Sequence, residues 1–299
     1  MQVKWIAADW GTSNLRLWAL GADGAILARK DSDQGMSRLT PETFESTLLG
    51  LIEPWLGAGV TPVIACGMVG ARQGWIEAAY RQVPCKPLSA EGLTLAPTQD
   101  PRLKVYIAPG LSQSSPADVM RGEETQIAGA LVQNPKFDGV ICLPGTHSKW
   151  AHISAEEVVS FQTFMTGELF ELLSQKSVLR HGIAESGADE AAFDEALSDA
   201  ISNPAKISAR LFGLRAEGLV NGLSPIAARA RLSGLLIGLE LAAARPYWLG
   251  QNVSLVGSSG LASAYARALA AQGVPSQILD PTACTLGGLS SLFKAKDAA

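Results

Sequence analysis

Hydrophobic residues in the first thirty positions fall into short runs that predict three β-strands. The runs VKWIAAD, LRLWAL and AILARK are separated by a Gly-Thr-Ser-Asn turn and a Gly-Ala-Asp-Gly turn. The middle run begins with an alternation of apolar and polar residues, which is typical of a strand. We therefore expect the chain to open with a three-stranded meander.

A helix and two more strands are predicted after the meander. Thr40 is a capping residue, Pro41 suits the first helical position, and Phe44 and Leu48 recur at helical spacing. The short apolar runs PVIAC and VYIAPG then predict two strands. A second helix is predicted from about residue 117 to residue 133. It should end there because an Asn-Pro pair follows.

The second half of the chain repeats this order of elements. The runs GVICLPG, SKWAHI and EVVSFQTF predict three strands, and a helical region with a long apolar helix near 225–245 follows. The strands VSLVG and PSQIL then alternate with two helices, at 259–272 and at 281–295, the second capped by Asp280.

The repeated order indicates an internal duplication. When Gly11 is placed on Gly145, the segment IAADWGTSN lies on VICLPGTHS, and the elements around both glycines correspond. We expect an α/β protein with two domains, residues 1–135 and residues 136–299, each with the order βββαβαβα.

Composition favours a protein that acts on a small molecule. The chain has 299 residues, of which 47% are hydrophobic, so it can bury a large core. The net charge is −4, and the absence of a block of Lys and Arg disfavours a nucleic-acid or membrane partner. Four widely spaced cysteines, without a CxxC pair, are typical of free thiols in a reducing cytoplasm. We expect a cytoplasmic protein with neither a signal peptide nor a membrane span.

The two Gly-Thr turns are candidate phosphate sites. Glycine lets the backbone approach an oxygen-rich anion, and the turn N–H groups with the hydroxyls of Thr12 and Thr146 can donate to it. Asp9 precedes the first turn, where its carboxylate suits Mg²⁺. The alternative is two ordinary hairpins, with Asp9 bonded to its own backbone.

Two further segments carry candidate chemistry. In LVGSSGLASAYARAL, a buried strand passes through Gly257 and Gly260 into a helix, which leaves room for a ring or a phosphate at the helix start. In DVMRGEETQIAGAL, Glu123 and Glu124 begin the uninterrupted part of a helix, where the helix dipole keeps a carboxylate ionised. Such a carboxylate can accept the proton of a hydroxyl that attacks a γ-phosphate. Ligand-free joints and stabilising surface acids remain the alternatives.

Taken together, these motifs resemble a known family. The opening DWGTSNLRLW, the second Gly-Thr turn and the GSSG joint resemble the phosphate and adenosine motifs of the sugar kinase, Hsp70 and actin superfamily. More closely, DWGTSNLRLW, GMVGARQGW, DVMRGEETQ, LPGTHSKW and FMTGELF resemble the 2-dehydro-3-deoxygalactonokinase family across most of the chain.

The resemblance implies two ribonuclease-H-like domains around a cleft, with ATP and Mg²⁺ phosphorylating the terminal 6-hydroxyl of 2-dehydro-3-deoxy-D-galactonate in galactonate catabolism. It also implies Glu123 as the base, in place of a more usual Asp, with Glu124 and Asp118 left open. Asp9 would hold the metal. The implied nucleotide-binding residues are Gly11, Thr12, Ser13, Gly145, Thr146, His147, Gly257, Ser258 and Gly260.

A sugar acid carries a carboxylate, so its pocket should contain Arg or Lys together with donor side chains. The loops DQGMSRL and GMVGARQGW supply Gln34, Ser37, Arg72 and Gln73, and Lys149 adds a charge near His147. Ordinary polar loops are the alternative for each residue alone. The sequence leaves open the oligomeric state, including a homo-oligomer, and the role of FMTGELF.

The sequence is also compatible with two other functions. One is a second kind of sugar kinase from the same superfamily, acting on a neutral hexose or an amino sugar. The other is an ATP-driven binding module of the Hsp70 or actin kind. A chain of 299 residues leaves little beyond two minimal domains for a partner-binding region, which disfavours the binding module.

Overall fold

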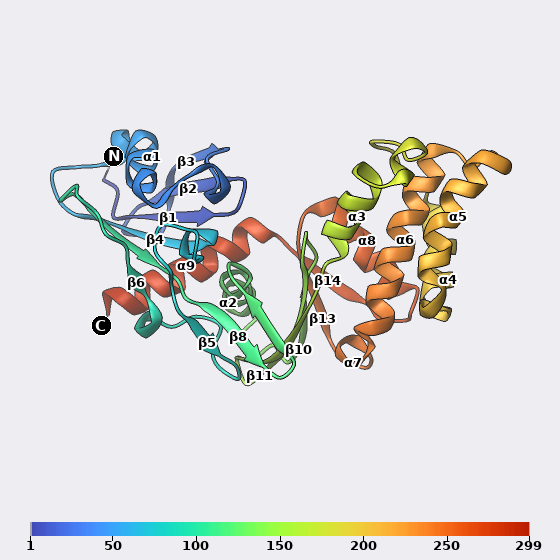
Figure 1. The fold of residues 1–299 in the computed structure, drawn as a ribbon. Helices are drawn as coiled ribbons and strands as arrows, with labels where there is room; N and C mark the ends of the chain where they lie inside the picture. The colour runs from blue at the N-terminus through green and yellow to red at the C-terminus, as the bar shows by residue number, and fades with distance from the viewer. Residues whose placement is uncertain (1, 299) are drawn as a thin grey trace. The chain divides into compact units, whose positions relative to one another are not determined.

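The computed structural model describes residues 2–298, which form two compact units (Figure 1). The first unit contains the described residues up to Asp138, then Ile153–Ser160 and the chain from Asp280 onward, and the second contains Gly139–His152 and Phe161–Leu279. The chain first changes unit three residues after the predicted domain boundary. The last helix, predicted as part of the second domain, packs in the first unit.

The main sheet of the first unit has six strands in the order β3-β2-β1-β4-β7-β6. The meander β1-β2-β3 is antiparallel, and β4 and β7 run parallel to β1. The strands are β1 (Trp5–Trp10), β2 (Leu15–Leu20), β3 (Ile26–Ser32), β4 (Thr61–Gly67), β6 (Thr94–Leu95) and β7 (Leu103–Ile107).

The second sheet has the order β12-β11-β10-β13-β14, with β10, β13 and β14 parallel. Its first three strands follow one another in the chain, as those of the first sheet do, so the two sheets share one topology. This confirms the predicted duplication. The strands are β10 (Gly139–Leu143), β11 (Ser148–Ser154), β12 (Glu157–Phe164), β13 (Val253–Val256) and β14 (Ser276–Leu279).

Two helices cover opposite faces of the first sheet. On one face, α1 (Phe44–Ile52) buries Phe44 and Leu48 against β1, β2 and β4. On the other face, α9 (Pro281–Asp297) buries Leu289 and Phe293, and the ring of Phe293 stacks on Trp5 at 4.6 Å between centroids. Both faces of the sheet are therefore apolar, as expected for a central sheet between helices.

Helix α2 (Glu123–Gln133) lies directly against α9 with backbone-to-backbone contact. A Cβ atom at Gly129 would lie 1.7 Å from the carbonyl oxygen of Cys284, and one at Gly288 would lie 2.1 Å from that of Thr125. Only glycine allows two helices to approach so closely at these points.

The second unit is mainly helical beyond its sheet. Helix α6 is buried along most of its length, and Gly234 and Gly238 on it bring it into close contact with α4. The helices are α3 (Thr166–Gln175), α4 (Glu190–Ser202), α5 (Ile207–Val220), α6 (Pro225–Ala243), α7 (Arg245–Trp248) and α8 (Ser259–Ala270). Across residues 2–298, the structure contains no helix that is long and apolar enough to span a membrane.

The prediction of a helix from residue 117 was wrong for its first turn. Residues Ala117–Met120 form strand β9, which pairs with β8 (Gly110–Ser114), and β8 pairs with β5 (Tyr80–Gln82) in a third sheet. Gly122 has φ 108°, which a helix cannot pass through, so α2 begins only at Glu123.

Short 3₁₀ helices connect these elements. They are η1 (Met36–Arg38), η2 (Pro41–Thr43), η3 (Glu53–Trp55), η4 (Met68–Gly70), η5 (Ala90–Gly92), η6 (Val178–His181) and η7 (Pro204–Lys206). Thr40 and Pro41 open η2, directly before α1, in the capping arrangement that the sequence predicts.

The glycine contact between α2 and α9 gives a stability prediction. Gly129→Ala should lower the free energy of unfolding by about 3 kcal/mol or more, because the added methyl group collides with backbone that cannot move alone. Gly50→Ala is the matched control, since Gly50 is exposed in α1 with open space around it, and it should raise stability by about 0.5–1 kcal/mol. Urea unfolding of both variants measures the contrast, and equal stabilities would contradict it.

Candidate active site

The first Gly-Thr turn joins β1 to β2 and is supported from outside by the loop around residue 36. Within the turn, the Gly11 N–H donates to the carbonyl of Asn14 at 2.9 Å. The N–H of Met36 donates to the carbonyl of Gly11 at 3.0 Å. The carbonyl of Thr12 accepts both the N–H and the hydroxyl of Ser37, each at 2.9 Å. The carbonyls of the turn are thus held by the loop.

The same loop packs on the turn through a glycine. A Cβ atom at Gly35 would lie 2.2 Å from the backbone of Ser13, and the carbonyl of Gln34 accepts from the indole N–H of Trp10 at 2.9 Å. The structure therefore brings Gln34 and Ser37, two predicted substrate residues, to the first turn. The hydroxyl of Ser37 already bonds the turn, while Thr12 and Ser13 are exposed.

Asp9 lies at the end of β1, opposite Arg16 on β2. An Arg16 guanidinium nitrogen lies 3.2 Å from one Asp9 oxygen, and the Asp9 side chain is 21% exposed. Burial raises the pKa of Asp9, the charge of Arg16 opposes this, and the charge of Glu123 raises it further. Asp9 and Glu123 are therefore close enough to influence each other, although they lie more than 100 residues apart in the chain.

Two glycines bring Glu123 to the end of β1. Gly67, paired with Trp10 across the parallel strands, has φ 90°, and a Cβ atom there would lie 2.8 Å from the Trp10 carbonyl. Gly122 has φ 108°, and its Cβ would lie 3.3 Å from the Cα of Gly67. Larger residues would have to adopt a strained conformation at both points. This contact sets the start of α2 against the ends of β1 and β4.

The two consecutive glutamates have opposite environments. Glu124 is fully buried, accepts the Gly122 N–H with both oxygens at 2.9 and 2.7 Å, and accepts the Thr125 hydroxyl at 3.2 Å. Burial, followed by the charge of Glu123, raises the pKa of Glu124 to about 8. Glu123 is half-buried, and one of its oxygens accepts the N–H of Arg121 at 3.1 Å.

Asp118, the third carboxylate left open by the sequence, lies on β9 rather than on a helix. It pairs with Gln113 of β8 in the hairpin register, and its carboxylate accepts the N–H of Val119 at 2.7 Å. Its position is set by the third sheet and differs from that of Glu123.

The loop that carries Arg72 and Gln73 is tied to the start of α2 by a buried arginine. Arg72 and Gln73 are exposed. Arg121 is 9% exposed, donates to the carbonyl of Ala78 at 2.7 Å and places its guanidinium 4.2 Å from the ring centroid of Tyr80. Arg121, which lies two positions before Glu123, therefore ties down the C-terminal end of this loop region, at Ala78 and Tyr80.

The second Gly-Thr turn lies between β10 and β11, in the second unit. His147 and Thr146 are exposed, and the His147 ring nitrogen Nε2 lies 2.6 Å from a carboxylate oxygen of Glu168. Lys149, predicted as a charge near the phosphates, is 4% exposed, and its ammonium donates to the carbonyl of His147 at 3.4 Å. Lys149 thus supports the turn from within the unit.

FMTGELF, which the sequence left without a role, supports this turn. Thr166 opens α3, and a Cβ atom at the next residue, Gly167, would lie 2.3 Å from the carbonyl oxygen of Gly145. The N–H of Glu168 donates to the carbonyl of Thr146 at 3.0 Å. A helix start is thus packed on the Gly-Thr turn, much as the loop around residue 36 is packed on the first one.

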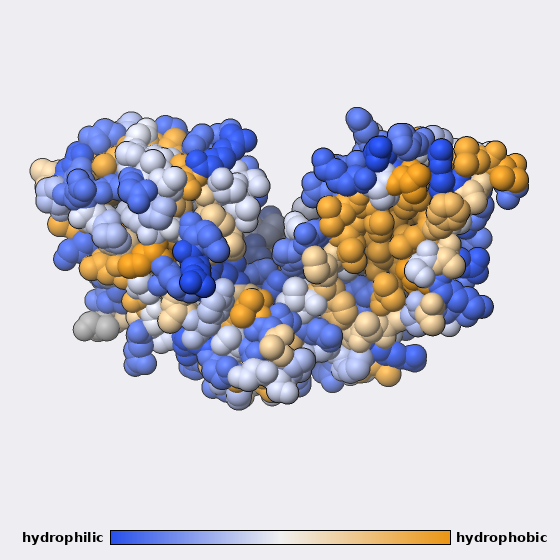
Figure 2. All heavy atoms as spheres, in the orientation of Figure 1, coloured by the Kyte–Doolittle hydropathy of each residue, from blue (hydrophilic) through white to orange (hydrophobic). Residues whose placement is uncertain are grey.

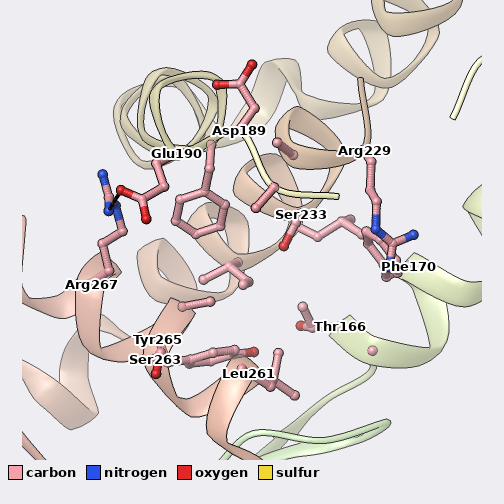
Figure 3. A pocket seen from close by; sticks show the side chains of 18 of the residues that line it. Thr166, Phe170, Asp189, Glu190, Arg229, Ser233, Leu261, Ser263, Tyr265 and Arg267 are labelled. Carbon is pink, nitrogen blue, oxygen red and sulfur yellow. Dashed lines mark hydrogen bonds and ion pairs between the residues drawn. The ribbon is translucent and has the colours of Figure 1, made fainter. Parts of the chain in front are cut away.

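A cavity of about 650 Å³ opens beside the second turn (Figure 3). Gly145 and Thr146 line it on one side, and Gly260 and Leu261 at the start of α8 line it on another. Figure 3 shows Arg229 beside the Phe170 ring and, on the far side of the cavity, Arg267 paired with Glu190. Figure 2 shows apolar side chains gathered on this part of the second unit, over α3 and α6. The apolar side chains in the lining include Phe170, Phe193, Leu236, Ile237 and Leu261.

The cavity includes some of the predicted adenosine residues and not others. Gly260 lines it, whereas Gly257 and Ser258 lie outside its lining, with Gly257 close to the carbonyl of Pro144. Phe170 and Arg229, which also line the cavity, are not among the predicted site residues. The guanidinium of Arg229 lies 4.9 Å from the Phe170 ring centroid. An aromatic residue and a cation in separate helices carry no local motif, because only the fold brings them together.

Among residues 2–298, no three His, Cys, Asp or Glu side chains cluster in a way that could hold a metal ion. One carboxylate together with substrate phosphates is nevertheless a common arrangement for Mg²⁺.

The duplicated sheets, with a Gly-Thr turn in each unit, form the two-domain α/β fold that is found in actin-like ATPases and sugar kinases. At the level of the fold, the chain is similar to the 2-hydroxyisocaproyl-CoA dehydratase activator of Clostridium difficile, solved with bound ADPNP. That structure has 13% sequence identity and a TM-score of 0.52, and the alignment covers 98% of this chain and 96% of the other.

The chain belongs to the 2-keto-3-deoxy-galactonokinase family, whose model matches residues 9–292. It is 36% identical over 276 residues to the 2-dehydro-3-deoxygalactonokinase of Escherichia coli (strain K12), with 91% of each chain covered. The crystal structure of a Sinorhizobium meliloti protein, provisionally described as the same kinase, matches with a TM-score of 0.90 and 41% identity. That match covers 97% of this chain and 96% of the other.

The buried carboxyl of Glu124 predicts a pH-dependent stability. Its pKa of about 8 in the fold lies above the 4.5 of an unperturbed glutamate. Its contribution to stability is therefore complete below pH 4.5 and is lost as the pH rises through 8, since the unfolded chain releases the proton first. Over this range, the stability difference between the wild type and Glu124→Gln should change by on the order of 3–5 kcal/mol.

Denaturant unfolding at pH 4.5 and at pH 8.5 measures this difference. The matched control is Glu77→Gln, which alters an exposed carboxylate of the same unit and should leave the pH dependence of the wild type in place. A Glu124→Gln curve parallel to that of the wild type would contradict the prediction.

Proposed function

We propose that the protein transfers the γ-phosphoryl group of ATP to the terminal 6-hydroxyl of 2-dehydro-3-deoxy-D-galactonate. Family membership and the similarity to the E. coli kinase support this substrate. The observation that carries the proposal is the contact between Gly122 and Gly67, because it sets Glu123, at the start of α2, against the end of β1, where Asp9 precedes the first Gly-Thr turn.

Glu123 is the general base in this proposal. It is half-buried, whereas Glu124 is fully buried and carries a proton up to a pH of about 8 because burial raises its pKa. A base must reach the acceptor hydroxyl, which a fully buried group cannot do without local unfolding. Asp118 lies on β9 and has its carboxylate engaged with the Val119 N–H. Of the three carboxylates, the geometry therefore favours Glu123.

The cavity of the second unit suits a nucleoside triphosphate. Phe170, Leu236 and Leu261 offer apolar surface to a base and ribose, and Arg229 on the Phe170 ring adds a flat cationic face. The turn at Gly145 and Thr146 lines the same cavity, so its N–H groups and hydroxyl can meet the phosphates of a nucleotide held there. His147 and Lys149 are the basic residues next to this turn, and Gly257 and Ser258 stay a prediction as nucleotide contacts.

Asp9 fits a magnesium site. Its carboxylate lies next to Gly11, Thr12 and Ser13, which we propose as the first phosphate turn, and it is 21% exposed. When bound with ATP, Mg²⁺ would neutralise phosphate charge. Arg16 holds the carboxylate of Asp9 in place, and Thr12 and Ser13 keep their hydroxyls exposed beside it.

The chemistry asked of the protein is mainly positioning. Phosphoryl transfer has a loose transition state, so the acceptor oxygen must be in line with the γ-phosphate, and Glu123 need only take the proton as the new bond forms. The ADP leaves with the electron pair of the broken bond. For the carboxylate of the acceptor, we propose Arg72 and Gln73, together with Gln34 and the backbone around Ser37. The loop that carries Arg72 and Gln73 is joined to Arg121, next to the start of α2, through the carbonyl of Ala78.

An acceptor panel tests the proposed function. With ATP and Mg²⁺, 2-dehydro-3-deoxy-D-galactonate should show a kcat/KM at least about 10²-fold above that of neutral hexoses or amino sugars, because these leave cationic and donor groups unpaired. Coupled ADP release measures each acceptor. Faster turnover of a neutral sugar would identify another sugar kinase, and ATP turnover independent of any acceptor would identify a binding module.

The role of Glu123 predicts a second result. Glu123→Gln keeps the size of the side chain but cannot take a proton, so kcat should fall by about 10²-fold or more while the affinity for ATP stays nearly unchanged. Glu124→Gln and Asp118→Asn are the controls and should lose less than tenfold. Steady-state kinetics in both substrates distinguishes the variants. A loss confined to the KM of the sugar acid would assign Glu123 to binding instead, and a large kcat loss in either control would move the base there.

A further inference from the structure

Glu240 is a buried carboxylate in an otherwise apolar stretch of α6. It is 2% exposed and lies between Leu239 and Leu241, in a helix that packs in the core of the second unit. A buried carboxylate is costly unless donors surround it. None of the sequence motifs that indicate a function includes Glu240.

Three donors from three different elements converge on this carboxylate. The indole N–H of Trp150, on β11, donates to one oxygen at 2.7 Å, and the hydroxyl of Tyr265, on α8, donates to the other at 2.7 Å. The hydroxyl of Thr166, at the start of α3, donates to that same second oxygen. Ser148 extends the network, because its hydroxyl lies 3.0 Å from that of Tyr265.

The network lies behind the wall of the cavity. Thr166 and Tyr265 line the cavity, whereas Glu240 is absent from its lining (Figure 3). Thr166 directly precedes Gly167, which contacts the carbonyl of Gly145, and Ser148 lies two residues after Thr146. One side chain outside the cavity thus connects the second Gly-Thr turn, the start of α3 and the helix of the adenosine loop.

We propose that Glu240 is a positioning residue for the nucleotide site, which fixes α3, α8 and the second Gly-Thr turn relative to one another through Thr166, Tyr265 and Trp150. This inference rests on the proposed function, since it takes the cavity to be the site of ATP. It assigns a purpose to FMTGELF, whose Thr166 connects the network to the turn.

The chemistry of the three donors explains why a carboxylate occupies this position. An indole N–H can only donate, and two hydroxyls can donate at the same time only to an acceptor with several lone pairs. An ionised carboxylate accepts all three. In an amide, the NH₂ group either faces the indole N–H of Trp150, which cannot accept, or faces the hydroxyls of Thr166 and Tyr265, which must then reverse to accept from it. Burial raises the pKa of Glu240, and the hydrogen bonds from Thr166, Tyr265 and Trp150 lower it.

A network that only stabilised the fold would change the unfolding temperature and leave the affinity of folded protein for the nucleotide unchanged. A positioning network changes that affinity. The two roles are therefore separated by calorimetric titration of a non-hydrolysable ATP analogue with Mg²⁺, carried out well below the unfolding temperature of every variant. This measurement needs no sugar acid, so it stands apart from the acceptor panel.

The variants are Glu240→Gln, Thr166→Val, Thr166→Ser and the double variant Glu240→Gln/Thr166→Val. Each of Glu240→Gln and Thr166→Val should weaken analogue binding by about tenfold, the size expected for one charge-assisted hydrogen bond. Thr166→Ser keeps the hydroxyl and should restore wild-type affinity. Because Thr166 acts through Glu240, the double variant should be scarcely weaker than either single one.

The control is Thr285→Val, which removes a buried hydroxyl from α9 of the first unit, where it bonds the carbonyl of Pro281. It should lower the unfolding temperature without changing analogue affinity. In steady-state assays, Glu240→Gln should raise the KM for ATP about tenfold and leave the KM for the acceptor within twofold.

Two results would overturn the proposal. One is analogue affinity within twofold of the wild type in Glu240→Gln, even if the variant unfolds at a lower temperature. The other is a double variant whose loss equals the product of the two single losses, because Thr166 would then act on the nucleotide directly. A wild-type protein that does not bind the analogue would instead refute the nucleotide site itself.

Discussion

The position of helix α2 in the first unit depends on the contact between Gly67 and Gly122. Both residues have a positive φ, and at each of them neighbouring backbone lies where a side chain would begin. One ends a parallel strand and the other precedes a helix, so the contact aims the helix start at the carboxyl ends of two neighbouring strands. Open α/β sheets commonly bind ligands at this edge. The start of α2, with Glu123, lies against the end of β1, with Asp9, only because two backbones can touch there.

The same contact separates two chemically identical neighbours. At the start of a helix, consecutive side chains point about 100° apart, so one glutamate faces outward while the next enters the core. Glu124 closes back on the Gly122 N–H and is protonated at neutral pH, whereas Glu123 keeps a half-buried position beside Asp9. The second unit also buries a carboxylate, that of Glu240, but there side-chain donors from three elements surround it.

Much of the architecture was predictable from local patterns. The structure confirms the predicted meander, the two Gly-Thr turns between strands and the long apolar helix near residue 230. The misassigned segment, residues 117–120, pairs with β8, a preference that no local pattern in the segment encodes. The contacts of Thr166 and Arg229 could not be predicted from local sequence either. Thr166 bonds a residue 74 positions away, and Arg229 stacks on Phe170 of another helix. A lone acid at position 240 within an apolar run was the one available signal for the network, because such a group requires buried partners.

Helix α9 gives the chain an order of assembly during synthesis. Domains ordinarily fold from the N-terminus as they leave the ribosome. Here one face of the first sheet, with Trp5 and Trp18, is covered by Leu289, Leu292 and Phe293, which are made only after the whole segment Phe161–Leu279. The second unit therefore has all of its residues available before the first can close its core. Until α9 has been made, the apolar face of the first sheet that carries Trp5 and Trp18 lacks the side chains that cover it in the folded protein.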